Sequence, residues 1–314
     1  EMSEGAKPLS VNQYYARLSQ RLIAAVSAPT AEGVLYEVDM RLRPSGSKGP
    51  VAASLASFQS YHRDSAWTWE KLALTRARPV CGDSGLMNEL TRHIHGALRE
   101  PRDAARVRED VVDMRKLMLK EQGTGGVWDV KRARGGLVEL EFIAQTLQLI
   151  HAHAHPHVLD TNTLAALQKL HAAGLVSDGD HAALKRAGLL YHRLTQMLRL
   201  CLDGPYDPAR ALPALNLLVA NTAVTPDIAT AEALLAEAQG EVAAIFDRLI
   251  ELRETEKLKF KLFIQVDPGY ARTACLTGRF DPESHTITNV RFRVAINCSQ
   301  NSAGSSVFHS TVVQ

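Results

Sequence analysis

Apolar and polar residues alternate along residues 34–43, whose sequence is VLYEVDMRLR. A period of two places successive side chains on opposite faces of an extended chain, so this pattern predicts a half-buried β-strand. Pro44, Ser45 and Gly46 follow, and these residue types favour the end of a strand and a polar turn. The face opposite the apolar residues carries the charged side chains of Glu37, Asp39, Arg41 and Arg43.

Neighbouring side chains on one face of a strand lie about 6–7 Å apart, from a rise of roughly 3.3 Å per residue. At that distance Asp39 and Arg41 could serve one ligand, with the carboxylate holding a cation and the guanidinium holding a phosphate. The same alternation is also typical of a solvated strand face with weak ion pairs. Spacing alone leaves both interpretations open.

Apolar residues spaced three and four positions apart dominate the rest of the chain as far as Leu252, and they predict amphipathic helices. Ser10 and Gln13 form a capping-box pattern at the first of them. Residues 73–80 are a possible further strand, and alternation beyond Glu254 predicts strands around 260–266 and over 286–296. Helices are predicted over residues 10–27, 54–62, 66–72, 84–100, 102–121 and 180–202, and from Leu137, Thr161 or Asn162, and Asp227 onward.

A basic stretch that ends in two glycines, WDVKRARGG at residues 128–136, directly precedes the predicted helix at Leu137. Glycines at a helix start allow close backbone approach, and the free N–H groups there favour anions, so this loop could contact a phosphate. The stretch is not a P-loop, because GxxxxGK[ST] is absent. The alternative is a structural ion pair, in which Glu141 on the apolar face of the helix is partnered by Arg134 or Lys131.

Two other stretches favour structural roles. Trp67 and Trp69 are expected in the core, because tryptophan brings a large area to bury. The histidines of HAHAHPH, residues 151–157, are expected at a helix end and in a loop, because Pro156 stops a helix and no neighbouring glutamate completes a metal-binding pattern.

The composition is that of an ordinary globular protein, with 46% hydrophobic and 22% charged residues. The net charge of +2 gives no general affinity for polyanions, so no nucleic-acid partner is expected. No apolar run reaches the ~18–20 residues of a membrane span, so no membrane association is expected. The four cysteines lie far apart without CxxC spacing, which predicts free thiols and a cytoplasmic location.

Four stretches carry a family resemblance: LYEVDMRLRPSGSKGPVA (35–52), AWTWEKLALTRARPVCGD (66–83), MRKLM (114–118) and WDVKRARGGLVELEFIAQ (128–145). Together they resemble the bifunctional glutamine synthetase adenylyltransferase/adenylyl-removing enzymes, and in particular the C-terminal adenylyltransferase half. Several separated motifs in the right order are far more specific than one short pattern.

The resemblance implies an α+β fold. Residues 1–100 would form part of a polymerase-β-type nucleotidyltransferase domain, and residues 101–253 a mostly antiparallel helical bundle. The β-like tail, residues 254–314, departs from the family. The implied activity is transfer of AMP from ATP to a tyrosine of glutamine synthetase, with removal by phosphorolysis in the same family. Mg²⁺ would be the cofactor, and a PII signalling protein would be a regulatory partner.

The resemblance also assigns roles to single residues. Asp39 would be a catalytic metal carboxylate with Glu37 as a second metal ligand, and Arg41 would act beside it in catalysis. Lys131 and Arg134 would lie where the catalytic domain meets the bundle. The nucleotide would be held by Arg43, Ser45, Gly46, Lys131 and Arg134.

The family's aspartate-x-aspartate pair should precede the first helix, and residues 1–30 contain no such pair. One carboxylate cannot hold two metal ions, so we expect a fragment with little adenylyl transfer on its own. The alternative is a non-catalytic module in which the helical bundle docks glutamine synthetase or a PII regulatory protein.

Overall fold

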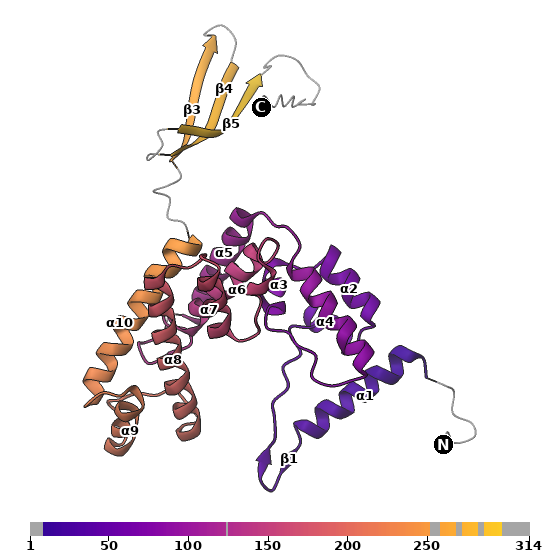
Figure 1. Ribbon diagram of the computed structural model, residues 1–314, viewed down its shortest axis with the longest axis vertical. Coiled ribbons are helices and arrows are strands. Elements are labelled where there is room, and N and C mark those ends of the chain that lie inside the picture. The colour runs from indigo at the N-terminus through magenta and orange to yellow at the C-terminus, as the bar shows by residue number, and fades with distance from the viewer. Residues whose placement is uncertain (1–8, 124, 252–257, 268–271, 282–285, 297–314) are drawn as a thin grey trace, which may run out of the picture. The chain divides into compact units, whose positions relative to one another are not determined.

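The computed structural model describes residues 9–123, 125–251, 258–267, 272–281 and 286–296. The chain divides into two compact units, Glu1–Phe246 and Asp247–Gln314. The first unit is mostly helical and carries one small hairpin (Figure 1). No helix among the described residues has both the length and the apolar content to span a membrane.

The first unit follows the predicted succession of helices closely. Its short elements are the strands β1 (Pro29–Thr30) and β2 (Gly33–Val34) and the 3₁₀ turns η1 (Gly46–Lys48) and η2 (Pro156–Val158). Its α-helices are α1 (Val11–Val26), α2 (Leu55–Asp64), α3 (Thr68–Leu74), α4 (Ser84–Leu98), α5 (Ala104–Gln122), α6 (Leu137–His151), α7 (Thr163–Ala172), α8 (Asp178–Cys201), α9 (Pro213–Ala223) and α10 (Ile228–Phe246).

Side-chain caps begin many of these helices, as the sequence predicts. Ser10 and Gln13 form the expected capping box at the start of α1. The Ser54 hydroxyl accepts from the Ser57 N–H at the start of α2, and Asn162 caps α7 in the same way. Each cap satisfies a backbone donor that has no partner inside the helix.

Helix α6 is the centre of the bundle. It contacts α3, α5, α7, α8 and α10, and ten of its residues are buried. Leu140 and Ile143 have no exposed surface, and Leu147 has 2%. A helix that is buried on nearly every side is enclosed by its neighbours, so α6 organises the helices of the first unit.

A buried ion cluster ties α5 and the 128–136 loop to α6. The Glu139 side chain is fully buried and the Arg115 side chain is 4% exposed, and Arg115 Nε donates to Glu139 Oε1 over 2.8 Å. The second oxygen of Glu139 accepts from Arg134 Nη1 at 2.5 Å and from the Gly135 N–H at 2.9 Å. Arg115 Nη2 also donates to the Arg132 carbonyl at 3.0 Å. The buried charge is therefore paired on both oxygens, as burial requires.

Gly135 is the point where the loop, α8 and α10 meet. Its φ is +73°, and a Cβ placed on it would lie 1.7 Å from the backbone oxygen of Gln239 in α10. The buried Tyr191 hydroxyl of α8 donates to the Gly135 carbonyl at 2.8 Å. Burial raises the pKa of Tyr191 well above its ordinary value, with the charge of Glu139 as a second cause. Only glycine fits here, because the position needs both a positive φ and an absent side chain.

The predicted strand over residues 34–43 is wrong beyond Val34. Residues 36–40 belong to no helix or strand, since β2 pairs only with β1, through Thr30 and Pro29. An alternating pattern alone does not make a strand, because a strand also needs a partner for its backbone groups. The apolar face that alternation predicts to be half-buried is exposed, at 66% for Tyr36 and 64% for Leu42.

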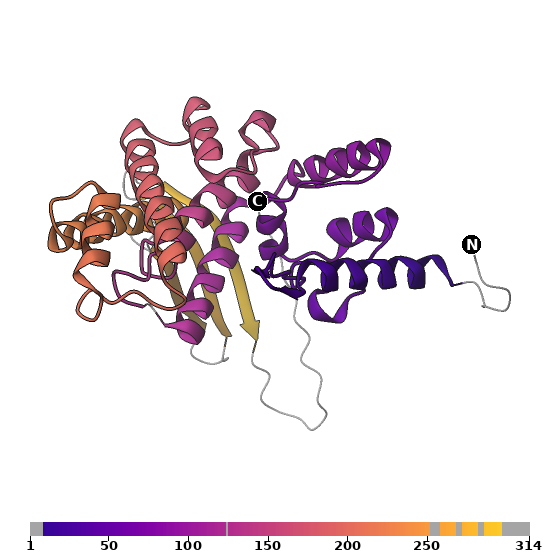
Figure 2. The same ribbon diagram turned by 90° about the horizontal axis from the view of Figure 1, so that it is seen from below.

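Helix α1 has the same character as this segment. It contains no buried residue, although its apolar residues have the predicted spacing. Figures 1 and 2 show α1 at the edge of the first unit, away from α10. Residues 10–43 therefore present an apolar surface that no described part of the chain covers. Its exposed large apolar side chains are those of Val11, Tyr14, Tyr15, Leu18, Leu22, Val34, Leu35, Tyr36, Val38 and Leu42.

Two more predictions for the first unit are wrong. Residues 75–80 form a turn and irregular chain rather than a strand, because no described strand lies beside them. The tryptophans are not in the core: Trp67 is 71% exposed and Trp69 is 38% exposed. Both lie at the start of the short helix α3, whose buried face is formed instead by Glu70, Leu72 and Leu74.

The second unit begins with one π-helical turn at Asp247–Glu251 and continues as an antiparallel sheet in the order β3-β4-β5. Strands β3 (Leu258–Asp267) and β5 (Thr286–Ile296) confirm the predicted alternation, and both pair with β4 (Arg272–Asp281). The register places Leu276 of β4 between Leu262 and Phe292. Strand β4 lacks clean alternation in its sequence and was not predicted.

Replacement of Gly135 by alanine should be far more costly than the same change at Gly174. Both have a φ of +73°, but nothing lies within 4 Å of a Cβ at Gly174. We expect Gly174→Ala to cost about 1 kcal/mol from backbone strain alone and Gly135→Ala about 3 kcal/mol or more. Urea unfolding followed by far-UV circular dichroism measures both. Equal costs would contradict the close approach of α10.

Truncation of Glu139 should destabilise the bundle strongly, because it leaves Arg115 buried without its carboxylate. We expect Glu139→Ala to cost about 3–5 kcal/mol. The matched control is Glu141→Ala on the same helix, which removes a partly exposed pair with Arg76 and should cost less than about 1 kcal/mol. The same urea titration compares them, and a Glu139 cost no larger than the control would refute the cluster's role.

Candidate functional site

Asp39 and Arg41 form a two-pronged ion pair on the segment after β2. Arg41 Nε lies 3.0 Å from both carboxylate oxygens of Asp39, and Arg41 Nη2 lies 2.7 Å from Oδ2. The Arg41 backbone N–H also donates to Asp39 Oδ1 at 2.9 Å. These hydrogen bonds lower the pKa of Asp39 to about 2. The carboxylate is therefore an anion over the whole physiological pH range.

The pair is open to solvent, with 85% of the Arg41 side chain and 54% of the Asp39 side chain exposed. The hydrogen bond to Asp39 raises the pKa of Arg41, and the charge of Glu37 adds to this shift. No group of three or more histidine, cysteine or acidic side chains able to hold a metal occurs in the described part of the chain. Asp39 and Glu37 alone do not fit a two-metal centre, because both oxygens of Asp39 are bound to Arg41.

Arg43 folds the turn that follows. Its guanidinium donates to the carbonyls of Met40 at 2.7 Å, Ser47 at 3.1 Å and Gly49 at 3.1 Å. Ser45 and Gly46 both have a positive φ, of 63° and 54°, which gives the tight reversal into η1. Arg43 has therefore little capacity left for a phosphate in this conformation, whereas Arg41 is free to exchange partners at the surface.

The structure places Lys131 and Arg134, which the sequence assigned to one site, on different sides of the basic loop. Arg134 turns inward to Glu139 and lies over the ring of Phe246, 5.4 Å from its centroid. Lys131 is exposed. The structural ion pair expected here exists, but its carboxylate is Glu139 rather than Glu141. Glu141 is bound by Arg76 at 2.9 Å, because the helix turns the two glutamates to different sides.

A cavity of about 840 Å³ adjoins the exposed side of this loop. Residues 125–132, the end of α8 from Thr195 to Leu202, and residues 204–209 line it, together with Glu232 of α10. We call it the loop cavity. Lys131 is the one predicted site residue in its wall, and Arg199 joins it from α8. Sequence reasoning missed Arg199, because nothing in its neighbourhood marks it apart from other exposed helix cations.

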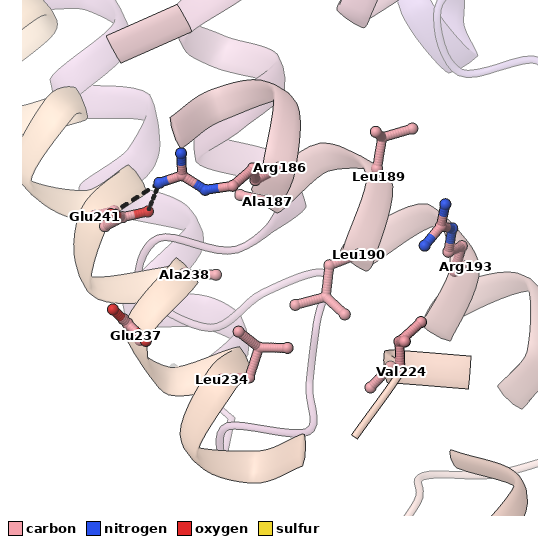
Figure 3. Close-up of a pocket in the computed structure, with 11 residues that line it drawn as sticks. Arg186, Ala187, Leu189, Leu190, Arg193, Val224, Leu234, Glu237, Ala238 and Glu241 are labelled. Carbon is pink, nitrogen blue, oxygen red and sulfur yellow. Dashed lines mark hydrogen bonds and ion pairs between the residues drawn. The ribbon is translucent and has the colours of Figure 1, made fainter. Parts of the chain in front are cut away.

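A second cavity of about 370 Å³ lies between α8, the end of α9 and α10. Figure 3 shows Leu190 of α8 and Leu234 of α10 directed into it, with Arg186 bound to Glu241 at one side. Both Arg186–Glu241 distances are 3.2 Å. Val224, at the end of α9, has a positive φ of 62° and is 78% exposed. The lining is largely aliphatic, and its charged side chains are those of Arg186, Arg193, Glu237 and Glu241.

Comparison with known families gives two matches. Residues 1–93 match the family model described as Glutamate-ammonia ligase adenylyltransferase. Residues 105–207 match the model described as GlnD PII-uridylyltransferase. The first match contains the Asp39–Arg41 pair, and the second contains α5, the basic loop and α6.

Curated relatives agree with the first match. The chain is 46% identical over 249 residues to the bifunctional glutamine synthetase adenylyltransferase/adenylyl-removing enzyme of Xanthobacter autotrophicus, covering 79% of this chain and 25% of the relative. The enzyme of the same name from Rhodopseudomonas palustris is 45% identical over 248 residues, with the same coverage. That from Agrobacterium fabrum is 49% identical over 232 residues, covering 73% of this chain and 23% of the relative.

The chain thus spans about a quarter of the length of these relatives. The curated relatives and the adenylyltransferase family model agree on the same family of enzymes. Over most of its residues, the chain is similar to the bifunctional glutamine synthetase adenylyltransferase/adenylyl-removing enzymes.

Proposed function

We propose that this chain is part of an enzyme that transfers AMP from ATP to a tyrosine of glutamine synthetase. The observation that carries the proposal is the Asp39–Arg41 pair, which lies in the region matched to the adenylyltransferase family. Removal of the AMP by phosphorolysis belongs to the same proposal, since the relatives are named for both activities. Regulation by a PII protein and a cytoplasmic location complete it.

Arg41 is the proposed phosphate ligand. It is the more exposed partner of the pair, and a surface ion pair is weak enough to exchange for a triphosphate with several negative charges. Exchange would leave the Asp39 oxygens free. Asp39 needs no proton to be removed first, because even its ordinary pKa of 3.8, without Arg41, lies well below neutral pH.

The proposal gives the remaining strand and turn residues supporting roles. Arg43 holds the chain reversal through three carbonyls, and Ser45 and Gly46 form that reversal, so they fix where Arg41 emerges. Mg²⁺ would polarise the phosphates when bound. Its site would need carboxylates beyond Asp39 and Glu37, so we expect little transfer by this chain alone.

A binding module for glutamine synthetase or a PII protein is the second candidate function. The exposed apolar side chains of α1 and of Trp67 favour it, since exposed apolar surface often marks a site of protein–protein interaction. In that case the chain would hold a partner without contributing to the chemistry.

Removal of Arg41 should restore an ordinary pKa to Asp39. We expect Arg41→Ala to raise the pKa of Asp39 from about 2 to near 3.8, because the hydrogen bonds from Arg41 are the largest cause of the shift. In the unchanged protein, the ion pair is complete at pH values above 3.8, the ordinary pKa of Asp39. It is lost as the pH falls through the lowered pKa of about 2. Carbon-13 NMR titration of the carboxyl measures this. The pKa of Asp64, lowered by Arg63, should not move, and an unmoved Asp39 would contradict the geometry.

Activity should depend on Asp39 once the chain is extended at its N-terminus with the corresponding segment of the Xanthobacter autotrophicus relative. We expect the extended protein to label glutamine synthetase from radioactive ATP and Mg²⁺, and Asp39→Asn to lower the rate by about 100-fold or more. Lys48→Ala, in the same turn, is the control and should keep the activity.

Full activity of Asp39→Asn in this assay would overturn the role of Asp39. Binding of glutamine synthetase without any transfer by the extended protein would favour the binding module.

A further inference from the structure

The loop cavity has the size and construction of a small-molecule site. Its volume of about 840 Å³ falls within the range of roughly 300–1,000 Å³ that such sites occupy. Its walls come from residues 125–132, from α8 and from the segment 204–209, which are far apart in the sequence. Most of the wall is apolar, with a few charged groups placed in it.

Two cations in this wall have no bound partner. Among the described residues, no hydrogen bond or ion pair involves the side chain of Lys131 or of Arg199, and both residues are exposed. The third cation differs, because Arg132 is bound to Asp129 at 2.7 Å. The pair of free cations can therefore accept an anion without breaking an existing contact.

The carboxylates of the wall already have donors. Asp129 binds Arg132, Glu232 Oε2 accepts from the indole of Trp128 at 3.1 Å, and Asp207 Oδ1 accepts from the backbone N–H of Ala209 at 3.0 Å. These bonds hold the carboxylates in place. An anion would thus be drawn to Lys131 and Arg199 and away from Glu232 and Asp207, which orients it in the cavity.

An aromatic wall completes the cavity. Trp128 and Tyr206 pack edge to face, with ring centroids 4.9 Å apart. Each ring is also held at its polar end, Trp128 by Glu232 and Tyr206 by a 2.5 Å hydrogen bond to Asn216. Tyr206 is 8% exposed, so Trp128 presents most of the apolar area of this wall, and rings held in this way lose little rotamer freedom on binding. The Thr195 hydroxyl, also in the wall, is buried without a partner.

We propose that the loop cavity binds a small organic oxyanion, whose phosphate or carboxylate group is held by Lys131 and Arg199 and whose apolar part lies against Trp128 and Tyr206. Arg199 was not among the predicted site residues, and the proposal pairs it with Lys131 in holding the anion. The proposal does not rest on the adenylyl transfer proposed above, because it uses none of residues 34–46.

Fluorescence of Trp128 tests the proposal. The chain has three tryptophans, so replacing the exposed Trp67 and Trp69 by phenylalanine leaves Trp128 as the only reporter. The protein is titrated separately with inorganic phosphate, adenosine 5′-monophosphate and succinate, and circular dichroism checks the fold. The test variant is Lys131→Ala/Arg199→Ala. The matched control is Lys185→Ala/Arg193→Ala, which removes two exposed cations of α8 outside the cavity.

We expect saturable quenching by at least one of the three anions, weakened about tenfold or more in the test variant and unchanged in the control. Tighter binding of the nucleotide than of phosphate identifies a phosphorylated ligand, and a response to succinate alone identifies a carboxylate. No response to any of them at about 10 mM, where a site of about 1 mM affinity is nearly filled, overturns the proposal. Equal weakening in the test and control variants overturns it as well.

Discussion

The buried carboxylate of Glu139 is the constraint on which the bundle depends. A carboxylate without exposed surface is stable as an anion only when its oxygens are paired, and here Arg115, Arg134 and the Gly135 N–H do so. These three groups come from α5 and from the basic loop. One side chain of α6 therefore fixes the position of a neighbouring helix and the path of the chain that leads into α6 itself.

The consequences of this cluster extend beyond its own contacts. Because Gly135 is held by Glu139, its carbonyl is available to Tyr191 and its bare Cα lies against the backbone of Gln239. The same loop conformation commits Arg134 to the core and leaves Lys131 outside, on the loop cavity. The stretch whose sequence suggests one basic patch therefore holds two different cations. Arg134 turns inward and stabilises the fold, and Lys131 turns outward and faces the loop cavity.

Residues 34–43 show the opposite situation. Their charged groups satisfy each other locally, in the Asp39–Arg41 pair and in the carbonyl contacts of Arg43. Their apolar face is exposed, and beyond Val34 their backbone pairs with no described strand, although the Tyr36 N–H donates to the Val26 carbonyl at 3.1 Å. The segment that carries the proposed chemistry thus packs poorly against the rest of the first unit, whereas the bundle helices bury their apolar side chains against one another.

Local signals made much of this structure predictable. Helix spacing and caps such as Ser10 with Gln13 depend only on neighbouring residues, and they gave most helices correctly. The strand over 34–43 failed because pairing depends on distant residues. The prediction that Glu141 is the carboxylate paired with the basic loop was wrong. The predicted start of the helix does not show which of two glutamates, two positions apart, faces that loop. One signal existed: Arg115 is four residues after Val111, on the apolar stripe of α5, where an arginine needs a buried carboxylate.

For the candidate site, the sequence indicated Asp39 with Arg41 by spacing and Lys131 by composition. It could not indicate Arg199 or Tyr206, because these residues reach the loop cavity only through the packing of α8 and of the segment after it. Nor could it show that Arg43 and Arg134 are occupied, one by carbonyls and the other by Glu139.

Native-state hydrogen exchange at single amides measures whether the Glu139 cluster anchors the fold while the backbone around Glu37 and Val38 lacks a neighbouring strand. We expect the N–H groups of Gly135 and Leu137, which donate to Glu139 and to the Val130 carbonyl, to exchange only through global unfolding. We expect rapid exchange at Glu37 and Val38. Fast exchange at Gly135 and Leu137, or equal protection at Glu37 and Val38, would show that the cluster does not anchor the fold.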